Sequence, residues 1–483
     1  MTAPRRAPSA LPAETPLVLL AVVTVLVALM YRRVFAGELA GDDNSFHWAE
    51  AVRIAEGLRH GELDWWNPSA NGGFATGYYY QLLPALVPGV LGALFGHTLF
   101  WFQLAVFVPL VLVPAAGYRA LRVLDVDPWP ALGGGVAVAF TLSNSKWGHG
   151  ADGVFAVGLF TQVAAFAAFP LALAHGVVWL RRGTNLASAI AWGAFAGMSH
   201  PVCGMALGAA LGPIAVTTAL AQALARGRWW PYPAPQPGGA AWRPLARVAV
   251  LGAALLVATA AAWAPTLIDY AAFGGFPHRL PDEAGPGFRK LARWLASGRF
   301  LDEGRRQVLT ALVPLGLVVA AVIDRRAHAL RACLVAALVF AFVIGIGKTL
   351  KSQDDLFPAI RFMGALQVVL GLGAGAGVLG LAQHAIRWAD RQPGGVALQG
   401  LVGAVIGLAL VGLAPSFGTQ HGRVRISTDW DTVYRAELRA IMPAIARARP
   451  GRLQNRGPEN HWAMMLPYIE IGRPTLVAYG GAS

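Results

Sequence analysis

The sequence predicts an all-α polytopic membrane protein, with about 11–12 transmembrane helices and a small extracytoplasmic α/β segment at the C-terminus. Three observations support this fold class. Of the 483 residues, 56% are hydrophobic and 13% are charged, whereas soluble domains carry about twice that charged fraction. Long apolar runs recur along the whole chain. Most of the arginines behind the net charge of +14 lie in short loops between those runs, as the positive-inside rule produces.

The same composition argues against several other classes of protein. A net charge of +14 would suggest nucleic-acid binding in a soluble chain, but here the charge follows the membrane topology. Cys203 and Cys333 both lie in apolar runs, so neither a disulfide framework nor a cysteine zinc site is indicated. The glycine run at 133–135 lies inside an apolar segment and indicates close helix packing. No G-x-G-x-x-G stretch joins a strand to a helix, so we expect no nucleotide cofactor.

The first apolar run, 17–35, is too long for the core of a signal peptide, so residues 1–15 are interpreted as a cytoplasmic tail. The predicted membrane module covers 16–413. Its further candidate spans are 78–95, 98–117, 129–142, 154–180, 186–199, 202–224, 248–268, 307–323, 330–347, 360–384 and 396–413.

Arginine-rich connections, such as that with Arg119 and Arg122, mark the cytoplasmic side and place the loops 36–77 and 269–306 outside. Segment 78–95 then cannot be a simple crossing, because Arg119 and Arg122 would otherwise lie on the wrong face. It opens with three tyrosines and contains two prolines, so we expect it to be re-entrant or partly interfacial. This gives about eleven crossings. If the chain crossed the membrane twelve times, the C-terminal segment would be cytoplasmic.

The stretch GDDNSFHW, 41–48, follows the first span directly and opens a predicted amphipathic helix. The helix is expected to begin near Asn44 or Ser45 and to end at Gly61. Its apolar face carries Ala51, Ile54, Ala55 and Leu58, and its other faces carry Glu50, Arg53, Glu56 and Arg59.

Two interpretations of Asp42 and Asp43 remain open. Acidic side chains are favoured at the N-terminus of a helix, so the pair could simply cap this one. Capping requires only one carboxylate, however, and Asp43 lies four residues before His47, on the same helical face. Asp43 and His47 would suit an oriented base or two ligands of a metal such as Mg²⁺ or Mn²⁺. We favour a catalytic or metal-binding role.

Further ionisable residues are predicted at the same membrane depth, where such groups are costly and indicate function. Acids, imidazoles and cations together suit a phosphate-bearing substrate. Each residue also has a structural alternative, such as a lipid contact, a helix end or snorkelling of Arg361. The residues are Lys146, His149, Asp152, His200, His278, Arg279, Lys348, Lys351, Asp354, Asp355 and Arg361.

The predicted extracytoplasmic regions contain their own elements. The second half of the 269–306 loop is amphipathic and is expected to lie along the membrane surface. From 414 to 483 the chain becomes polar, with a soluble helix over 428–449 and then two short strands around a helix. This segment is expected to be a small domain or the beginning of a truncated one.

The motifs G-D-D-x-x-F-H-x-x-x-A, W-N-P, G-G-F and G-Y-Y-Y-Q-L-L-P, all within 41–84, resemble those of GT-C class integral membrane glycosyltransferases. The closest group is the bacterial 6-pyruvoyl-tetrahydropterin-synthase-related membrane proteins, with the YfhO-like proteins as neighbours. The likeness is strongest over 17–95. It continues more weakly at His200-Pro201, at Arg361-Phe362 and near the C-terminus.

The resemblance implies an inverting transfer of a sugar from a polyprenyl-phosphate carrier to a glycan, lipid or protein acceptor. The site would face the periplasm or exterior of a bacterial cytoplasmic membrane. Asp42 or Asp43 would be the base or metal contact, and Asp43 is our choice because it shares a face with His47. His47, His200, Arg361, His149, Lys146 and Arg279 would line the site or hold phosphate.

Two other functions compete with this one. A transporter or lipid flippase would use the polar groups as a substrate path, but these gather at one end of the helices rather than near the midplane. A non-catalytic subunit of an envelope-polysaccharide system remains an alternative, because a second acidic motif is not defined: Asp152 competes with Asp354 and Asp355.

Overall fold

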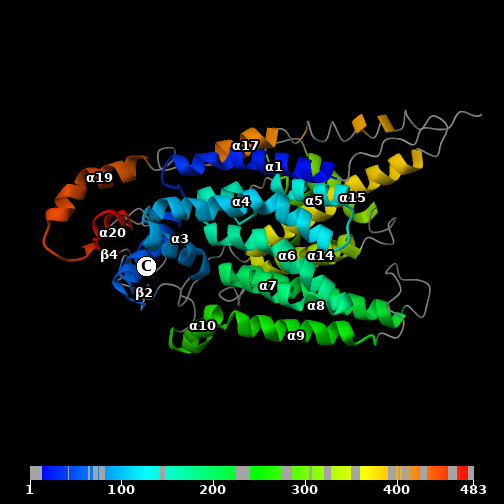
Figure 1. Cartoon of the computed structure of the whole chain (residues 1–483), viewed down its shortest axis with the longest axis horizontal. Helices are drawn as coiled ribbons and strands as arrows, with labels where there is room; N and C mark the ends of the chain where they lie inside the picture. The colour runs from blue at the N-terminus through cyan, green and yellow to red at the C-terminus, as the bar shows by residue number, and fades with distance from the viewer. Residues whose placement is uncertain are drawn as a thin grey trace, which may run out of the picture.

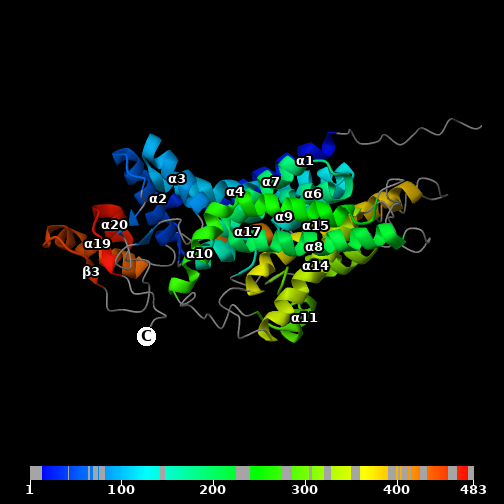
Figure 2. The ribbon, with the colours of Figure 1, turned by 90° about the horizontal axis from the view of Figure 1, so that it is seen from below.

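The computed structural model describes residues 14–41, 43–63, 66–68, 74–75, 82–141, 147–224, 240–273, 285–303, 307–319, 328–349, 359–389, 399–400, 403–404, 412, 415–424, 432–454 and 465–476. Long helices form an elongated bundle, and a group of shorter helices and strands lies at one end of it (Figure 1). We call that end the outer end. Figure 2 shows α2, α3, α19 and α20 gathered there.

The first two long helices fix the direction of the chain. Helix α1 (Thr15–Tyr31) continues as the 3₁₀ turn η1 (Arg32–Ala36), and α4 covers Thr98–Val123. The ring centroids of Phe35 and Phe100 are 5.8 Å apart, and Gln103 Nε2 donates to the Gly37 carbonyl at 2.6 Å. Helix α4 therefore begins at the outer end, where α1 finishes.

Segment 78–95 lies between α1, which finishes at the outer end, and α4, which begins there. Its described part is α3 (Leu82–Phe95), 14 residues long, or about 21 Å at 1.5 Å per residue. The hydrocarbon core of a bilayer is about 30 Å thick. Helix α3 packs on α2 (Asn44–His60), and the chain returns to α4 at the end it left. This agrees with a segment that does not cross.

The remaining helices follow the predicted spans closely. Six helices in the described part of the chain are long and apolar enough to cross a membrane: Thr15–Ala36, Thr98–Val123, Phe160–Arg182, Pro201–Ala223, Ala329–Gly347 and Ala359–Ala389. Shorter apolar helices cover Leu83–Phe95, Leu186–Ser199 and Val308–Leu317. Most of 396–413 lies outside the described residues. The prediction of an all-α polytopic membrane protein is confirmed.

In chain order after α4, the helices of the bundle are α5 (Pro128–Ala139), the π-helical turn η2 (Gly153–Val157), α6 (Phe160–Arg182), α7 (Leu186–Ser199), α8 (Pro201–Leu224), α9 (Arg243–Ala258), α10 (Ala260–Phe273), α11 (Phe288–Ala296), α12 (Val308–Pro314), the π-helical turn η4 (Leu315–Val319), α14 (His328–Gly347), the 3₁₀ turn η6 (Ala359–Phe362) and α15 (Met363–Ala389). Helix α11 is the amphipathic part expected in the 269–306 loop.

The bundle core depends on close approach of α5 and α15. A Cβ atom added to Gly133 would collide with the Gly375 carbonyl oxygen, and one added to Gly375 would collide with the Gly133 carbonyl. Between helices in lipid, van der Waals packing of small residues replaces the hydrophobic driving force. The prediction that the glycines at 133–135 serve helix packing is confirmed.

The C-terminal segment forms α17 (Pro415–Arg423), α19 (Thr432–Arg447), β3 (Leu453–Gln454), α20 (Leu466–Ile471) and β4 (Thr475–Leu476). Strands β3 and β4 pair in parallel, so the predicted arrangement of two strands around a helix is present. Tyr468 of α20 donates to Glu56 of α2 at 3.0 Å, and Met465 packs on Ala49. A small antiparallel pair, β1 (Trp66–Asn67) and β2 (Phe74–Ala75), follows α2.

We expect Gly133→Val to lower the free energy of unfolding by about 1–3 kcal/mol, because the added methyl groups cannot be accommodated without separating α5 from α15. Gly208→Val is the matched control, since no atom lies within 4 Å of a Cβ at that helical glycine. Unfolding by sodium dodecyl sulfate in mixed micelles, followed by circular dichroism, measures both. Equal destabilisation of the two variants would contradict the packing explanation.

Candidate functional site

The residues before α2 lie against the turn that precedes α6. The Asp43 amide donates to the Val157 carbonyl at 2.8 Å, and the Asn44 side-chain amide donates to the Val154 carbonyl at 2.9 Å. The Asp43 carboxylate makes no capping hydrogen bond to the described backbone of α2. Asp43 is nevertheless the N-cap residue of α2, so its charge still lies where a helix N-terminus favours an anion. Helix α2 begins at Asn44 and ends before Gly61, whose φ is 72°, as predicted.

Two glycines permit this contact between loops. Gly158 has a φ of +95°, and a Cβ atom there would lie 2.6 Å from the amide nitrogens of both Asp43 and Asn44. Gly41 has a φ of +119°, and a Cβ atom there would lie 2.8 Å from Asn44 Nδ2. Other residues rarely adopt such φ values. The bend at Asp43 and Asn44, which we call the corner before α2, is therefore held against Gly158 by a contact between backbones.

His47 is oriented by a carboxylate that sequence analysis assigned to a polar face. Its Nδ1 lies 2.9 Å from Glu50 Oε2, and each side chain is only 2% exposed. The His47 ring packs edge-on against Phe160, with centroids 4.8 Å apart. Sequence analysis placed Glu50 outside the apolar face of this helix, and its burial was not predicted, because the spacing of apolar residues cannot reveal a paired, buried carboxylate. Because Nδ1 faces Glu50, a proton taken from a ligand would go to Nε2.

His200 and Arg361 lie within electrostatic range of each other. His200 ends α7 and is 2% exposed, and neither ring nitrogen has a partner among the described residues. Burial, with smaller contributions from Arg361 and His47, lowers the pKa of His200 to about 3. The Arg361 guanidinium lies over the Trp147 ring, 4.5 Å from its centroid. The outer end thus brings His47, His200 and Arg361 together.

Other buried polar atoms near this end also lack partners in the described part of the chain. They include Thr161 Oγ1 and Gln162 Oε1 at the start of α6 and Ser199 Oγ at the end of α7. Gln162 Nε2 donates to the Trp147 carbonyl at 3.3 Å, which connects this group to Arg361. Buried polar groups in native proteins are almost always hydrogen-bonded, so a polar ligand or ordered water would satisfy these atoms.

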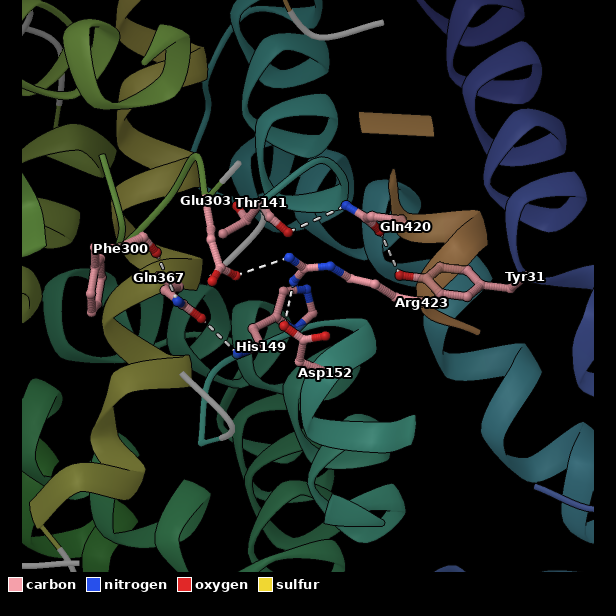
Figure 3. Close-up of polar contacts among 9 residues, drawn as sticks. All are labelled: Tyr31, Thr141, His149, Asp152, Phe300, Glu303, Gln367, Gln420 and Arg423. Carbon is pink, nitrogen blue, oxygen red and sulfur yellow. Dashed lines mark hydrogen bonds and ion pairs between the residues drawn. The ribbon is translucent and has the colours of Figure 1, made fainter. Parts of the chain in front are cut away.

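His149 and Asp152 lie in a network of polar contacts that links the loop before α6 to α15, α17 and the turn at 300–303 (Figure 3). The His149 amide donates to Gln367 Oε1 at 2.6 Å, and burial lowers the pKa of its ring to about 4. Asp152 pairs with Arg423 of α17, which also pairs with Glu303 at 2.9 Å. His149 is 8% exposed, so a surface contact with lipid headgroups does not describe it.

Several predicted residues lie outside the described part of the chain. They are Asp42, Lys146, His278, Arg279, Lys351, Asp354 and Asp355. Within the described part, no group of three or more His, Cys, Asp or Glu side chains is placed to hold a metal ion.

Sequence reasoning missed residues whose partners are distant in the chain. Gln367, Trp147 and Arg423 have no local motif, and nothing in their neighbourhood indicates their contacts. Glu50 could have been found, because it lies three residues after His47 on the same helix, at a spacing that lets side chains meet.

The chain is similar in structure to membrane glycosyltransferases. It matches an oligosaccharyltransferase from Archaeoglobus fulgidus in the apo form, with 12% identity and a TM-score of 0.53, over 96% of this chain and 64% of that one. It matches ArnT from Cupriavidus metallidurans bound to undecaprenyl phosphate, with 14% identity and a TM-score of 0.55, over 96% and 86%. It also matches the mycobacterial arabinofuranosyltransferase AftD, with 18% identity and a TM-score of 0.51, over 90% and 29%.

These identities show the fold alone. The chain spans less than two thirds of the length of the oligosaccharyltransferase that it matches. No protein-family model matches the sequence, and no curated protein sequence matches it. The chain therefore has the architecture of GT-C membrane glycosyltransferases and is a multi-pass membrane protein.

His200 should make the protein acid-sensitive. Its folded pKa of about 3 lies below the ordinary value of 6.5, so the unfolded chain binds more protons between those values and stability falls as the pH drops. For one group the slope is at most about 1.4 kcal/mol per pH unit. Thermal unfolding measured from pH 7 to 4.5 tests this. The melting temperature of His200→Gln should fall less with decreasing pH than that of the wild type, and His60→Gln, at the exposed end of α2, should behave like the wild type. Identical profiles for wild type and His200→Gln would contradict the assignment.

A side chain at position 158 should lower the stability of the protein by more than the strain of its positive φ alone. Gly158→Ala adds a collision with the Asp43 and Asn44 amides to the strain of a positive φ. Gly61→Ala imposes a comparable positive φ with no atom within 4 Å of the new Cβ. We expect the melting temperature to fall clearly further for Gly158→Ala than for Gly61→Ala. A similar fall in both would show that the contact contributes little.

Proposed function

We propose that this chain is a glycosyltransferase that moves a sugar from a polyprenyl-phosphate-linked donor to a glycan, lipid or protein acceptor. The site would open at the outer end, on the extracytoplasmic side of a bacterial cytoplasmic membrane. The fold supports the class of enzyme. The proposal rests on the position of His200 within electrostatic range of both His47 and Arg361, at the end of the bundle where Asp43 precedes α2. Buried polar atoms that lack partners in the described part of the chain lie at the same end.

The reaction that we propose is a single displacement. The acceptor hydroxyl oxygen attacks the anomeric carbon of the sugar, and the bond from that carbon to the phosphate oxygen breaks with inversion. Asp43 takes the hydroxyl proton as the bond forms. The polyprenyl phosphate leaves with the electron pair of the broken bond, and the Arg361 cation stabilises its developing charge. Asp42 is the other candidate base.

The imidazoles would act as hydrogen-bonding groups. His200, whose low pKa keeps it neutral at pH 7, can donate from one ring nitrogen and accept at the other. His47, fixed by Glu50, presents Nε2 in one orientation. Lys146 and Arg279 remain proposed phosphate contacts. His149, predicted to join them, is held by Gln367 through its main-chain amide and packs its ring on Phe166, and its imidazole stays a proposed contact.

A divalent cation such as Mg²⁺ or Mn²⁺ is compatible with part of this donor set. Asp43 and His47 would hold it, and a carboxylate behind a ligating histidine, as Glu50 lies behind His47, is the usual outer contact of such a ligand. A bound cation would neutralise charge on the donor phosphate. No nucleotide cofactor is required, because the donor carries its own leaving group.

Within this class, the motifs at 41–84 favour the 6-pyruvoyl-tetrahydropterin-synthase-related and YfhO-like proteins as relatives of the chain. A flippase is less favoured, because the described polar groups gather at one end of the helices and a transport site lies near the midplane.

Asp43→Asn should lower transfer by roughly 10²- to 10⁴-fold, the usual contribution of a general base. Protein in nanodiscs would receive a panel of polyprenyl-phosphate sugars and a crude envelope extract, with and without Mg²⁺ or Mn²⁺, and release of free polyprenyl phosphate would be measured. Glu437→Gln, at an exposed position of α19, is the matched control. Transfer that survives in Asp43→Asn would move the base to Asp42 or a later loop. Donors that bind without release in wild type would favour a flippase or a non-catalytic subunit.

A further inference from the structure

The loop before α6 is held at two points by side chains that also hold the turn at 300–303 (Figure 3). Gln367 accepts from the His149 amide at 2.6 Å and donates to the Phe300 carbonyl at 2.9 Å. Arg423 pairs with Asp152 through Nη1 and with Glu303 through Nη2. Gln367 and Arg423 therefore form two parallel bridges between the same two segments.

The Arg423 bridge leads directly to the corner that carries Asp43. Asp152 is the residue immediately before the π-helical turn η2. The carbonyls of Val154 and Val157 in η2 accept from Asn44 Nδ2 and from the Asp43 amide. Any shift of η2 must therefore move the Asp43 backbone or break these two hydrogen bonds. π-Helical turns are frequent at functional sites.

Helix α17 is anchored by contacts other than those of Arg423. Tyr31 donates to Gln420 Oε1 at 2.7 Å, and Gln420 Nε2 reaches the Thr141 carbonyl at 3.3 Å. His421 Nδ1 lies 2.8 Å from the Met30 carbonyl oxygen. These contacts fix α17 on α1 and on the end of α5. The Arg423 side chain is 22% exposed and lies between two carboxylates, so its removal leaves α17 docked.

We infer that Arg423 is a positioning residue for the Asp43 carboxylate, acting through Asp152 and η2. The inference rests on the proposed function, because it assigns Asp43 the catalytic proton transfer. Arg423 does not contact the substrate. Its guanidinium sets where η2 lies, and η2 sets where the Asp43 backbone lies. The C-terminal segment thereby takes part in building a site whose other residues come from the first three quarters of the chain.

Arg423→Gln should lower kcat by roughly 10- to 100-fold, because displacement of a catalytic group by about 1 Å has an effect of this size. The KM for the donor should change less than kcat, since Arg361 and His200 are not in this path. Arg423→Lys keeps one positive charge and should recover part of the loss. Arg447→Gln, an exposed arginine at the end of α19, is the matched control and should leave both constants unchanged.

Two further measurements distinguish positioning from a general loss of structure. The double variant Arg423→Gln, Asp152→Asn should have the same kcat as the less active of the two single variants, because both substitutions disrupt the same chain of contacts. Hydrogen–deuterium exchange of wild type and Arg423→Gln should show faster exchange in the variant over 41–48 and 153–160, and equal exchange in α19. If Arg423→Gln does not fold, Arg423→Lys and Asp152→Asn carry the same comparison.

Different results would contradict the role of Arg423 and the glycosyltransferase activity. Multiplicative effects of the two substitutions on kcat, or unchanged exchange over 41–48, would overturn the path from Arg423 to Asp43. If wild type releases no polyprenyl phosphate from any donor, the proposed function fails, and exchange alone decides the coupling. Faster exchange over 41–48 would then support the coupling in a protein with a different activity.

Discussion

The backbone contact between the Asp43–Asn44 corner and Gly158 is the constraint on which the outer end depends. A side chain at 158 would occupy the space of two amide groups, so the loop after α1 and the turn before α6 approach as closely as they do only because of glycine. That approach sets the direction in which α2 leaves the corner. The direction of α2 places His47 against Phe160 and leaves Glu50 buried behind it.

The electrostatic character of this end follows from burial. Two histidines, His149 and His200, are neutral because their surroundings penalise a charged ring. Arg361 lies within electrostatic range of His200, and its guanidinium rests on the face of Trp147. An aromatic face stabilises a cation without neutralising its net charge. The arrangement therefore combines the Arg361 cation with the neutral His200 ring and the His47–Glu50 pair, groups that can bind a ligand with an anionic group and many hydroxyls.

The sequence predicted the elements of the fold because their signals are local. The bounds of helix α2 were predicted from Asn44, a residue favoured at helix starts, and from Gly61, which can adopt the left-handed conformation that ends a helix. The packing role of the glycines at 133–135 followed from their apolar context. The spacing of His47 and Glu50 suggests that the two side chains meet, but the sequence does not reveal that both are buried, because the packing around α2 comes from distant segments such as α6 and α20. The Tyr468–Glu56 bond, for example, joins residues 412 positions apart.

The same limit applies to the site. Asp43, His47, His200 and Arg361 were predicted as site residues by type and membrane depth, and the structure brings His47, His200 and Arg361 together. Their supporting contacts were not predicted, because pairs such as Asp152–Arg423 depend on how α17 docks on α1. Hydrophobic periodicity specifies which face of a helix is apolar, but it does not specify which distant polar side chain meets an acid.

The docking of α17 also has a consequence for biosynthesis. Arg423 follows Asp152 by 271 residues, and at about 5–20 residues per second the ribosome requires on the order of tens of seconds to make that stretch. During this interval the corner before α2 is held by the Gly158 contact and by the hydrogen bonds of Asp43 and Asn44 to η2, without the Arg423 ion pair. The ion pair forms only when the last part of the bundle has been inserted, so an incomplete chain at the translocon lacks the last contact that locks this corner.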